Sequence, residues 1–279
     1  MPGTLYLVAT PIGNLGDFSP RAAETLEKVD FIAAEDTRVT VKLLNHLGLK
    51  KPMVSYHRHN ADTKGEALTD RLMAGESCAL VTDAGTPAIS DPGEELVAQC
   101  AARDIPVVPI PGACAFVNAL AVSGLPTGRF TFEGFLAMNK KNRRTHLESL
   151  KQEERTMLFH EAPHKLPATL VDLKETFGAD RRVALCREMT KLHEQVWRTT
   201  LGEAADYYQT NSPKGEFVLV VEGAPHQEKE TWTMEEGLEL VQRLKEGGLS
   251  TRDAVKQAAA DSGLSRKALY SLAVSGQDR

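Results

Sequence analysis

The chain has 279 residues, of which 42% are hydrophobic and 25% are charged, a composition typical of a soluble protein long enough for two domains. Its formal net charge of −5 argues against a protein that binds nucleic acid through an overall basic surface. The four cysteines form no CxxC pair, which disfavours a zinc site and is typical of reduced thiols in a cytosolic protein.

The first 124 residues are predicted to alternate strands with helices. Apolar runs predict strands at 4–10, 30–35, 52–57, 78–82 and 105–110. Helices are expected at 21–29, 38–48, 62–74, 94–102 and 115–124. Ser19 and Pro20 suit the cap and first turn of the first helix, and Gly48 suits the end of the second. Because the strands are apolar on both sides, we expect a parallel sheet covered by helices on both faces.

The most membrane-like stretch is 105–122, which contains three prolines and Gly112. Prolines interrupt a helix, so this stretch predicts a buried strand followed by a buried helix rather than a membrane span. The N-terminus runs from Met-Pro-Gly directly into a strand-like segment, without the pattern of a signal peptide. We therefore expect a cytoplasmic protein.

A second α/β domain is predicted at 125–223, after a possible hinge at 124–128. Its strands are expected at 129–136, 155–162, 182–188, 195–201 and 216–223, with helices near 140–151, 164–177 and 202–209. No helix separates 182–188 from 195–201, so these two strands predict a hairpin and a mixed sheet. A polar linker at 223–232 then leads to a helical extension, 232–279, in which Gly263 separates two helices in the outline of a helix-turn-helix.

Four loops rich in Gly, Pro and short polar side chains follow predicted strands of the first domain. They are 10–17, 35–38, 82–93 and 110–115. In an open α/β sheet, ligands bind outside the carboxyl ends of the strands, where such loops converge. The loops contain neither GxGxxG followed by an acid nor GxxxxGK[ST], which disfavours enzymes that hold a phosphate in a glycine-rich loop.

Seven segments resemble, in order, the motifs of the tetrapyrrole-methylase superfamily. They are TPIGN, AEDTR, HxHN, VTDAGTPAISDPG, PIPGACA, FHEAPHK and CREMTKLHE, and the similarity runs from about residue 4 to 223. Within the superfamily, the chain is similar to bacterial 2′-O-methyltransferases of 16S ribosomal RNA. The resemblance implies two α/β domains, usually in a homodimer, with S-adenosylmethionine (SAM) between them and no metal. It also implies methylation of a cytidine ribose in the decoding region of the small ribosomal subunit.

The resemblance also implies which residues contact the cofactor. They are Pro11, Asp83, Thr86, Ile89, Cys114, Ala115, Glu161 and Met189. The superfamily's GGDP loop is replaced here by AGTP at 84–87, so Thr86 stands where other branches have Asp, and this position has no carboxylate. Cys114 is interpreted as a packing thiol rather than a nucleophile.

The charged segment 186–194 is the candidate catalytic region, and the alternative interpretation is a solvated turn. We expect Lys191 at the reacting oxygen, with Glu188 orienting it. A free Lys has a pKa of about 10.4, so Lys191 is a base only if its surroundings lower that pKa, and otherwise stabilises an alkoxide. Arg38, with Glu35 and Asp36, is a candidate for gripping the ribose-phosphate. His57 and His59 are either proton carriers or structural histidines.

The candidate RNA-binding residues are Lys140, Lys141, Arg143 and Arg144, for which a solvated helix start is the alternative. Two other functions remain open at this point. One is a methyltransferase of the same fold that acts on a tetrapyrrole or another small metabolite. The other is a non-enzymatic RNA-binding or assembly factor. A small-molecule enzyme needs neither the basic segment nor the helical extension.

Overall fold

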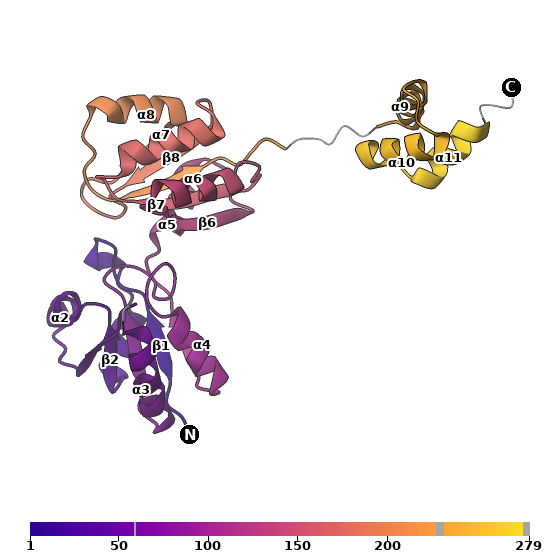
Figure 1. The fold of residues 1–279 in the computed structure, drawn as a ribbon. Coiled ribbons are helices and arrows are strands. Elements are labelled where there is room, and N and C mark those ends of the chain that lie inside the picture. Colours follow the sequence, from indigo (N-terminus) through magenta and orange to yellow (C-terminus); the bar gives the residue numbers. More distant parts are fainter. Residues whose placement is uncertain (59, 227–231, 276–279) are drawn as a thin grey trace. The chain divides into compact units, whose positions relative to one another are not determined.

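The computed structural model describes residues 1–58, 60–226 and 232–275 (Figure 1). The chain divides into two compact units, Met1–Ala224 and Pro225–Arg279. His59, residues 227–231 of the predicted linker and residues 276–279 of the predicted extension lie outside the described residues.

The first sheet has five parallel strands in the order β3-β2-β4-β1-β5. Their bounds are β1 Leu5–Val8, β2 Phe31–Ala34, β3 Met53–Ser55, β4 Cys78–Val81 and β5 Val107–Ile110. The predicted parallel sheet is therefore confirmed. The four polar loops follow β1, β2, β4 and β5, which are neighbours in the sheet. All four therefore lie at the same end of the sheet, beyond the carboxyl ends of these strands.

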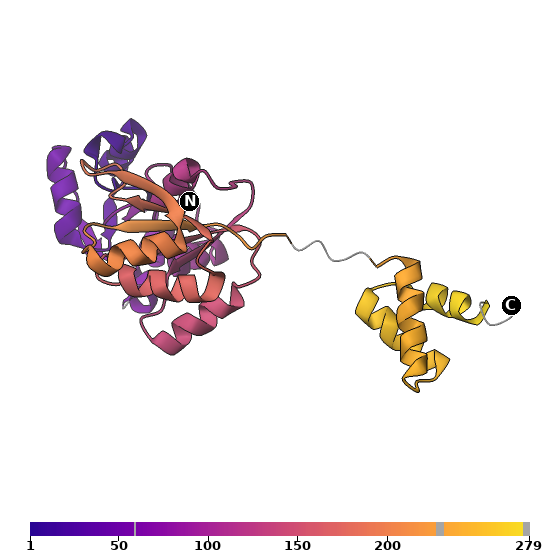
Figure 2. The same cartoon turned by 90° about the horizontal axis from the view of Figure 1, so that it is seen from above.

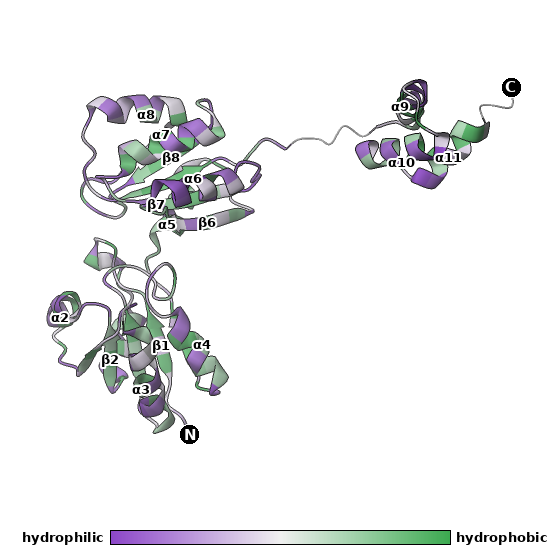
Figure 3. Cartoon of the chain, viewed as in Figure 1, coloured by the Kyte–Doolittle hydropathy of each residue, from purple (hydrophilic) through white to green (hydrophobic). Residues whose placement is uncertain are grey.

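Helices cover both faces of this sheet, as predicted (Figure 1 and Figure 2). They are α1 Pro20–Lys28, α2 Thr37–His46, α3 Ala61–Met73 and α4 Glu94–Ala102, with a short 3₁₀ turn at Leu15–Asp17. Successive residues of β2 separate the two cores: Phe31 packs with residues of α3 and α4, whereas Ile32 packs with residues of α1 and α2. The strands are mostly hydrophobic and the helices mix both kinds of residue (Figure 3).

Strand β5 departs from the prediction of a buried strand, because it lies at the edge of the sheet and only Ile110 is fully buried. Pro109 is exposed there, and proline suits an edge strand because it has no N–H to donate to a further neighbour. The helix that follows, α5 (Ala115–Ser123), buries Ala119 and Leu120 but exposes part of its surface. Among the described residues, no helix is long and apolar enough to cross a membrane.

The second sheet is mixed, with the order β6-β7-β10-β8-β9. Its strands are β6 Phe130–Phe135, β7 Thr156–Glu161, β8 Arg182–Arg187, β9 Gln195–Thr200 and β10 Phe217–Val221. Strands β6 and β7 are parallel, and the remaining neighbours are antiparallel. The predicted β8–β9 hairpin and mixed sheet are confirmed.

Helix α5 covers one face of the second sheet, where it packs with Leu158 and Val218. The other face is covered by α6 Lys140–Ser149, α7 Leu166–Phe177 and α8 Leu201–Thr210. By packing, α5 therefore goes with the second sheet, although it precedes the predicted boundary at residue 124. The division into domains 1–124 and 125–223 stays a prediction.

The described part of the second unit contains three helices, α9 Met234–Glu246, α10 Thr251–Ser262 and α11 Arg266–Ser275. Its small core includes Ala254, Val255 and Ala258. Gly263 ends α10 in the left-handed conformation, with φ of 69°. A capping box formed by Thr233 and Glu236 begins α9.

Candidate functional site

A cavity of about 440 Å³ lies where the loops of the first sheet meet the second sheet. Its wall includes Ile12, Asp83 and Asp91 from the loops of the first sheet, Glu161 from the end of β7 and Met189 from the turn after β8. This volume lies within the usual range of small-molecule sites, about 300–1,000 Å³.

Seven of the predicted site residues line this cavity. They are Glu35, Asp83, Ile89, Ala115, Glu161, Met189 and Lys191. Five other predicted residues are absent from its wall, namely Pro11, Thr86, Cys114, Glu188 and Arg38. The lining shows which side chains are near one another, and their individual roles stay predictions.

The loops after β1, β4 and β5 are tied together by hydrogen bonds. The backbone groups of Thr10 and Gly85 exchange two hydrogen bonds, of 2.9 and 3.1 Å. The hydroxyl of Thr86 donates to the carbonyl of Ala113 over 3.2 Å. Thr86 therefore joins the loops after β4 and β5 instead of facing the cavity, and Cys114 lies beside it. Burial raises the pKa of Cys114, which supports a packing thiol.

The loops after β2 and β4 are joined by two carboxylates. The N–H of Asp83 donates to Glu35 over 3.3 Å, and the N–H of Asp36 donates to Asp83 over 3.2 Å. Burial raises the pKa of Asp83. Arg38 instead forms an ion pair with Asp36, and its side chain is 88% exposed. The structure therefore places Glu35 and Asp83 at the cavity and Arg38 outside it.

Asp91 is a cavity residue that the sequence analysis missed. Burial raises its pKa to about 6, and the nearby carboxylates of Glu35 and Asp83 add to this effect, whereas Arg58 opposes it. Asp91 belongs to the 82–93 loop, which was predicted to lie at a ligand site because of its Gly, Pro and short polar residues. Its position in that loop could therefore have identified it as a candidate site residue. Three acidic side chains from the loops of the first sheet thus face this cavity.

The backbone is in the left-handed region on both sides of the cavity. In the 81–93 loop, Ala88 and Ser90 have φ of 67° and 66°. In the turn after β8, Glu188 and Thr190 have φ of 52° and 66°. Side chains other than Gly rarely adopt this conformation, and such strain gathers at ligand sites. The two strained segments are the two that contribute Asp91 and Lys191.

The ammonium group of Lys191 lies between two carboxylates. Its Nζ donates to Oε1 of Glu188 over 3.0 Å and to Oε2 of Glu216 over 2.8 Å. Burial lowers the pKa of Lys191, but the hydrogen bonds to Glu216 and Glu188 outweigh it, so the pKa is raised overall. Lys191 is therefore a cation at neutral pH. Glu188 is its partner, as expected, and Glu216 is a second one that the sequence analysis missed.

The alkyl chain of Lys191 crosses Gly13, in the loop after β1. A Cβ atom on Gly13 would lie 2.3 Å from Cγ of Lys191, and Gly13 has φ of +148°. Both observations require glycine at this position. Lys191 thus connects the turn after β8 with the first loop of the parallel sheet.

Glu161 and Cys186 form part of the wall contributed by the second sheet. Glu161 is buried and accepts hydrogen bonds from the N–H of Ala162 over 2.8 Å and the hydroxyl of Thr169. These bonds fix its carboxylate at the start of α7. Burial raises the pKa of Cys186 to about 12, so this thiol stays neutral.

His57 does not line the cavity: its N–H donates to Oδ1 of Asn60 over 2.9 Å, next to β3. His59 lies outside the described residues. Within the described ranges, no group of three or more His, Cys, Asp or Glu is arranged to hold a metal ion.

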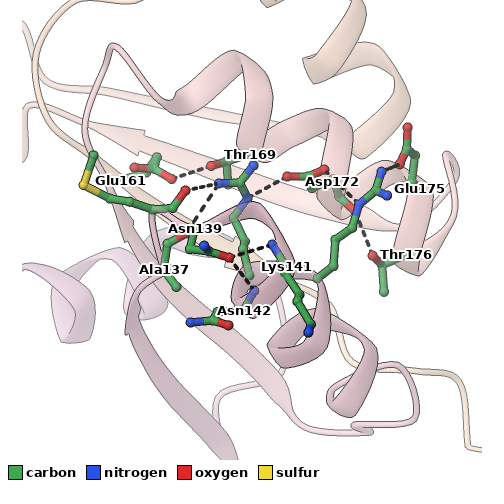
Figure 4. A network of polar contacts seen from close by, with 12 residues as sticks. Ala137, Asn139, Lys141, Asn142, Glu161, Thr169, Asp172, Glu175 and Thr176 are labelled. Carbon is green, nitrogen blue, oxygen red and sulfur yellow. Dashed lines mark hydrogen bonds and ion pairs between the residues drawn. The ribbon is translucent and has the colours of Figure 1, made fainter.

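The basic segment on α6 is partly neutralised by α7 (Figure 4). Arg143 pairs with Asp172 over 2.6 Å, and both side chains are largely buried. Arg144 pairs with Glu175 over 3.0 Å. Lys140 and Lys141 are exposed. The two arginines therefore hold α6 against α7, and the lysines offer the more accessible charge.

Residues 4–205 match the family model described as Tetrapyrrole (Corrin/Porphyrin) Methylases. The chain belongs to this family. Residues 234–277 match a second model, described as the RsmI C-terminal HTH domain, which agrees with the expected helix-turn-helix outline.

Curated relatives are similar over almost the whole chain. A protein of Synechocystis sp. named Ribosomal RNA small subunit methyltransferase I is 51% identical, with 98% of each chain covered. Proteins of the same name from Halalkalibacterium halodurans and Pseudomonas aeruginosa are 48% and 42% identical, covering 97% and 99% of this chain and 94% and 99% of theirs.

Solved structures share the fold at low sequence identity. A diphthine synthase has a TM-score of 0.60 at 14% identity, covering 80% of this chain and 92% of its own. A uroporphyrin-III C-methyltransferase from Thermus thermophilus, complexed with S-adenyl homocysteine, has a TM-score of 0.54 at 17% identity, covering 78% and 97%. These likenesses support the two-sheet architecture.

Asp91→Asn should stabilise the unliganded protein at neutral pH. The folded-state pKa of about 6 lies above the ordinary value of 3.8, so the folded state binds this proton more tightly than the unfolded state does. Its stabilising contribution is complete below the unfolded pKa and is lost as pH rises through the folded pKa. After allowance for solvent screening, the variant should gain about 1–2 kcal/mol above pH 6, or roughly 2–8 °C in Tm.

Thermal unfolding of both proteins between about pH 4 and 8 measures this difference. The advantage of the variant should grow up to about pH 6 and then level off. A difference in Tm that does not change with pH would contradict the assignment of the raised pKa to Asp91.

Proposed function

We propose that this chain uses SAM to methylate the 2′-oxygen of a cytidine ribose in 16S ribosomal RNA, in the decoding region of the small subunit. The observation that carries the proposal is similarity of 42–51% identity, over nearly the full length, to proteins named Ribosomal RNA small subunit methyltransferase I. The alternative of a small-metabolite methyltransferase leaves the second unit unexplained, since its family model is that of the RsmI C-terminus.

The cavity suits SAM by the chemistry of its wall. SAM carries a sulfonium and an ammonium charge, and the carboxylates of Glu35, Asp83 and Asp91 supply negative charge. Ile89 and Ala115 offer apolar surface for an adenine ring. We assign cofactor contacts to these residues, with Glu161 and Met189 on the opposite wall and Pro11, Thr86 and Cys114 supporting the loops.

When bound, SAM supplies the methyl group and a leaving group that departs without help. The protein then has to align the ribose hydroxyl and manage its proton. Protonated Lys191 donates a hydrogen bond to the oxygen as negative charge develops there. Glu188 and Glu216 hold the ammonium group in place. We propose Asp91 as the acceptor for the proton, because it lines the cavity and its raised pKa makes it a stronger base than an ordinary carboxylate.

The proposed enzyme is a cytoplasmic homodimer that acts on an assembled small subunit. The exposed surface of α5 supports the dimer, because Val117 and Val122 are 46% and 39% exposed on a largely apolar helix. Lys140 and Lys141 form the proposed RNA contact on the first unit, with the paired Arg143 and Arg144 behind them. The three-helix second unit provides a further contact.

The deciding experiment incubates small ribosomal subunits with radiolabelled SAM and maps the label. A methylated 2′-oxygen cannot attack the neighbouring phosphate, so the modified linkage should appear as a gap in an alkaline ladder. A ladder without a gap, together with a methylated base by mass spectrometry, would refute ribose methylation. Free 16S RNA assayed in parallel distinguishes the naked from the assembled substrate.

Lys191→Ala should reduce single-turnover methylation by about 10²–10³-fold, the usual effect of removing one donor that stabilises a developing oxyanion. Lys191→Arg should keep substantially more activity, because the raised pKa of Lys191 indicates a cationic role that a guanidinium also fulfils. Calorimetry with SAM provides the control, since affinity should stay within a few-fold. A near-native rate in the Ala variant would remove Lys191 from the chemical step.

The double variant Lys140→Gln, Lys141→Gln should weaken binding to the subunit and flatten its salt dependence by about 0.7–0.9 for each phosphate that is no longer neutralised. The matched control changes two other exposed lysines, Lys42 and Lys50, to Gln. Arg143 is left intact, because its removal would leave Asp172 buried without its partner. Equal salt slopes in both variants would assign the α6 lysines to plain solvated surface.

A further inference from the structure

A second cavity, of about 520 Å³, lies against the β8–β9 hairpin and α8. Its wall includes Trp197, Tyr207, Tyr208, Arg187, Lys214 and Asn211. We call it the aromatic pocket. None of its described lining residues is Asp or Glu, although the chain as a whole is acidic. It is therefore a locally basic and aromatic site.

The three rings form a continuous edge-to-face series. Trp197 and Tyr207 have centroids 5.0 Å apart at 68°, and Tyr207 and Tyr208 have centroids 5.0 Å apart at 89°. Trp197 and Tyr208 also pack against the buried core of the second sheet, which fixes their positions. Tyr207, the middle ring of the series, is 49% exposed and presents an aromatic surface to a ligand.

The aromatic pocket lies at the same end of the second sheet as the cavity that contains Lys191, because Arg187, Gln195 and Phe217 are paired neighbours in β8, β9 and β10. Tyr208 contacts Phe217 edge-to-face at 5.9 Å, and Phe217 lines the first cavity. Arg187 directly precedes Glu188, and its Nε donates to the carbonyl of Lys214 over 2.6 Å. This bond holds the loop that leads to Glu216, the second partner of Lys191. The same short segments thus form both sites.

We infer that the aromatic pocket binds an unpaired base of the RNA substrate beside the target nucleotide, with Arg187 and Lys214 facing its phosphate. This inference rests on the proposed function and adds a subsite to it. RNA-binding proteins that recognise unpaired nucleotides stack bases on aromatic rings and pair phosphates with cations. The pocket and Lys191 lie at the same end of the second sheet, and we therefore place the nucleotide next to the target ribose in the pocket.

Two variants and a binding probe test the inference. Tyr207→Ala should weaken binding to the subunit by about 5- to 150-fold, the usual effect of removing one base-stacking ring. Tyr207→Phe keeps the ring and should bind as the wild type does. SAM affinity should be unchanged in both, because Tyr207 lies outside the first cavity. Tm should be unchanged in Tyr207→Phe, which keeps the ring contacts with Trp197 and Tyr208.

Fluorescence reports the stacking directly. The chain has two tryptophans, so Trp232→Phe leaves Trp197 as the only source of tryptophan emission. A short unpaired oligocytidylate should quench Trp197, and Lys214→Gln should shift this titration to higher concentrations. Absence of quenching, with Tyr207→Ala binding subunits normally, overturns the inference.

Two further outcomes also distinguish the inference from its alternatives. If the wild type transfers no methyl group to any RNA, the proposed function fails, and the oligonucleotide titration still tests base binding by itself. If Tyr207→Ala instead turns a dimer into a monomer in solution, the pocket is a subunit contact and the inference is wrong.

Discussion

The ammonium group of Lys191 pairs with two carboxylates, and this pairing connects the segments that form the first cavity. Glu188 comes from the turn after β8, Glu216 from the residue before β10, and the stem of Lys191 lies on Gly13 of the first loop. A buried or half-buried cation needs such partners, because water cannot fully solvate it. The position of the turn after β8, and with it the shape of the cavity, therefore depends on the pairing of Lys191 with Glu188 and Glu216.

The loops of the parallel first sheet supply negative charge to the same cavity, opposite in sign to the ammonium group of Lys191. Because all strands of this sheet run in one direction, the loops that follow them lie at one end of the sheet. The carboxylates of Glu35, Asp83 and Asp91 come together there. Burial and mutual repulsion both raise the pKa of Asp91. A site of this kind favours a positively charged ligand, since the ligand relieves the repulsion that the fold imposes.

The sequence was sufficient for the elements and for the loops at the sheet edge, because both depend on local patterns. Apolar runs marked the strands of the first sheet, and Gly- and Pro-rich segments marked the loops that follow them. Contacts between segments that are distant in the chain could not be predicted from the sequence. Glu216 lies in no recognisable motif and reaches Lys191 only because β10 pairs with β8. Likewise, nothing in the α6 segment revealed that Asp172 would take up Arg143.

The edges of the first sheet also affect how the protein behaves in a crowded cell. An exposed edge strand presents unpaired N–H and C=O groups to which another chain can add. At one edge, Pro109 in β5 removes a donor, and at the other, β3 has only three residues. Neither edge is a good template for a further strand. The edge strands of this sheet therefore do not promote fibrous aggregation.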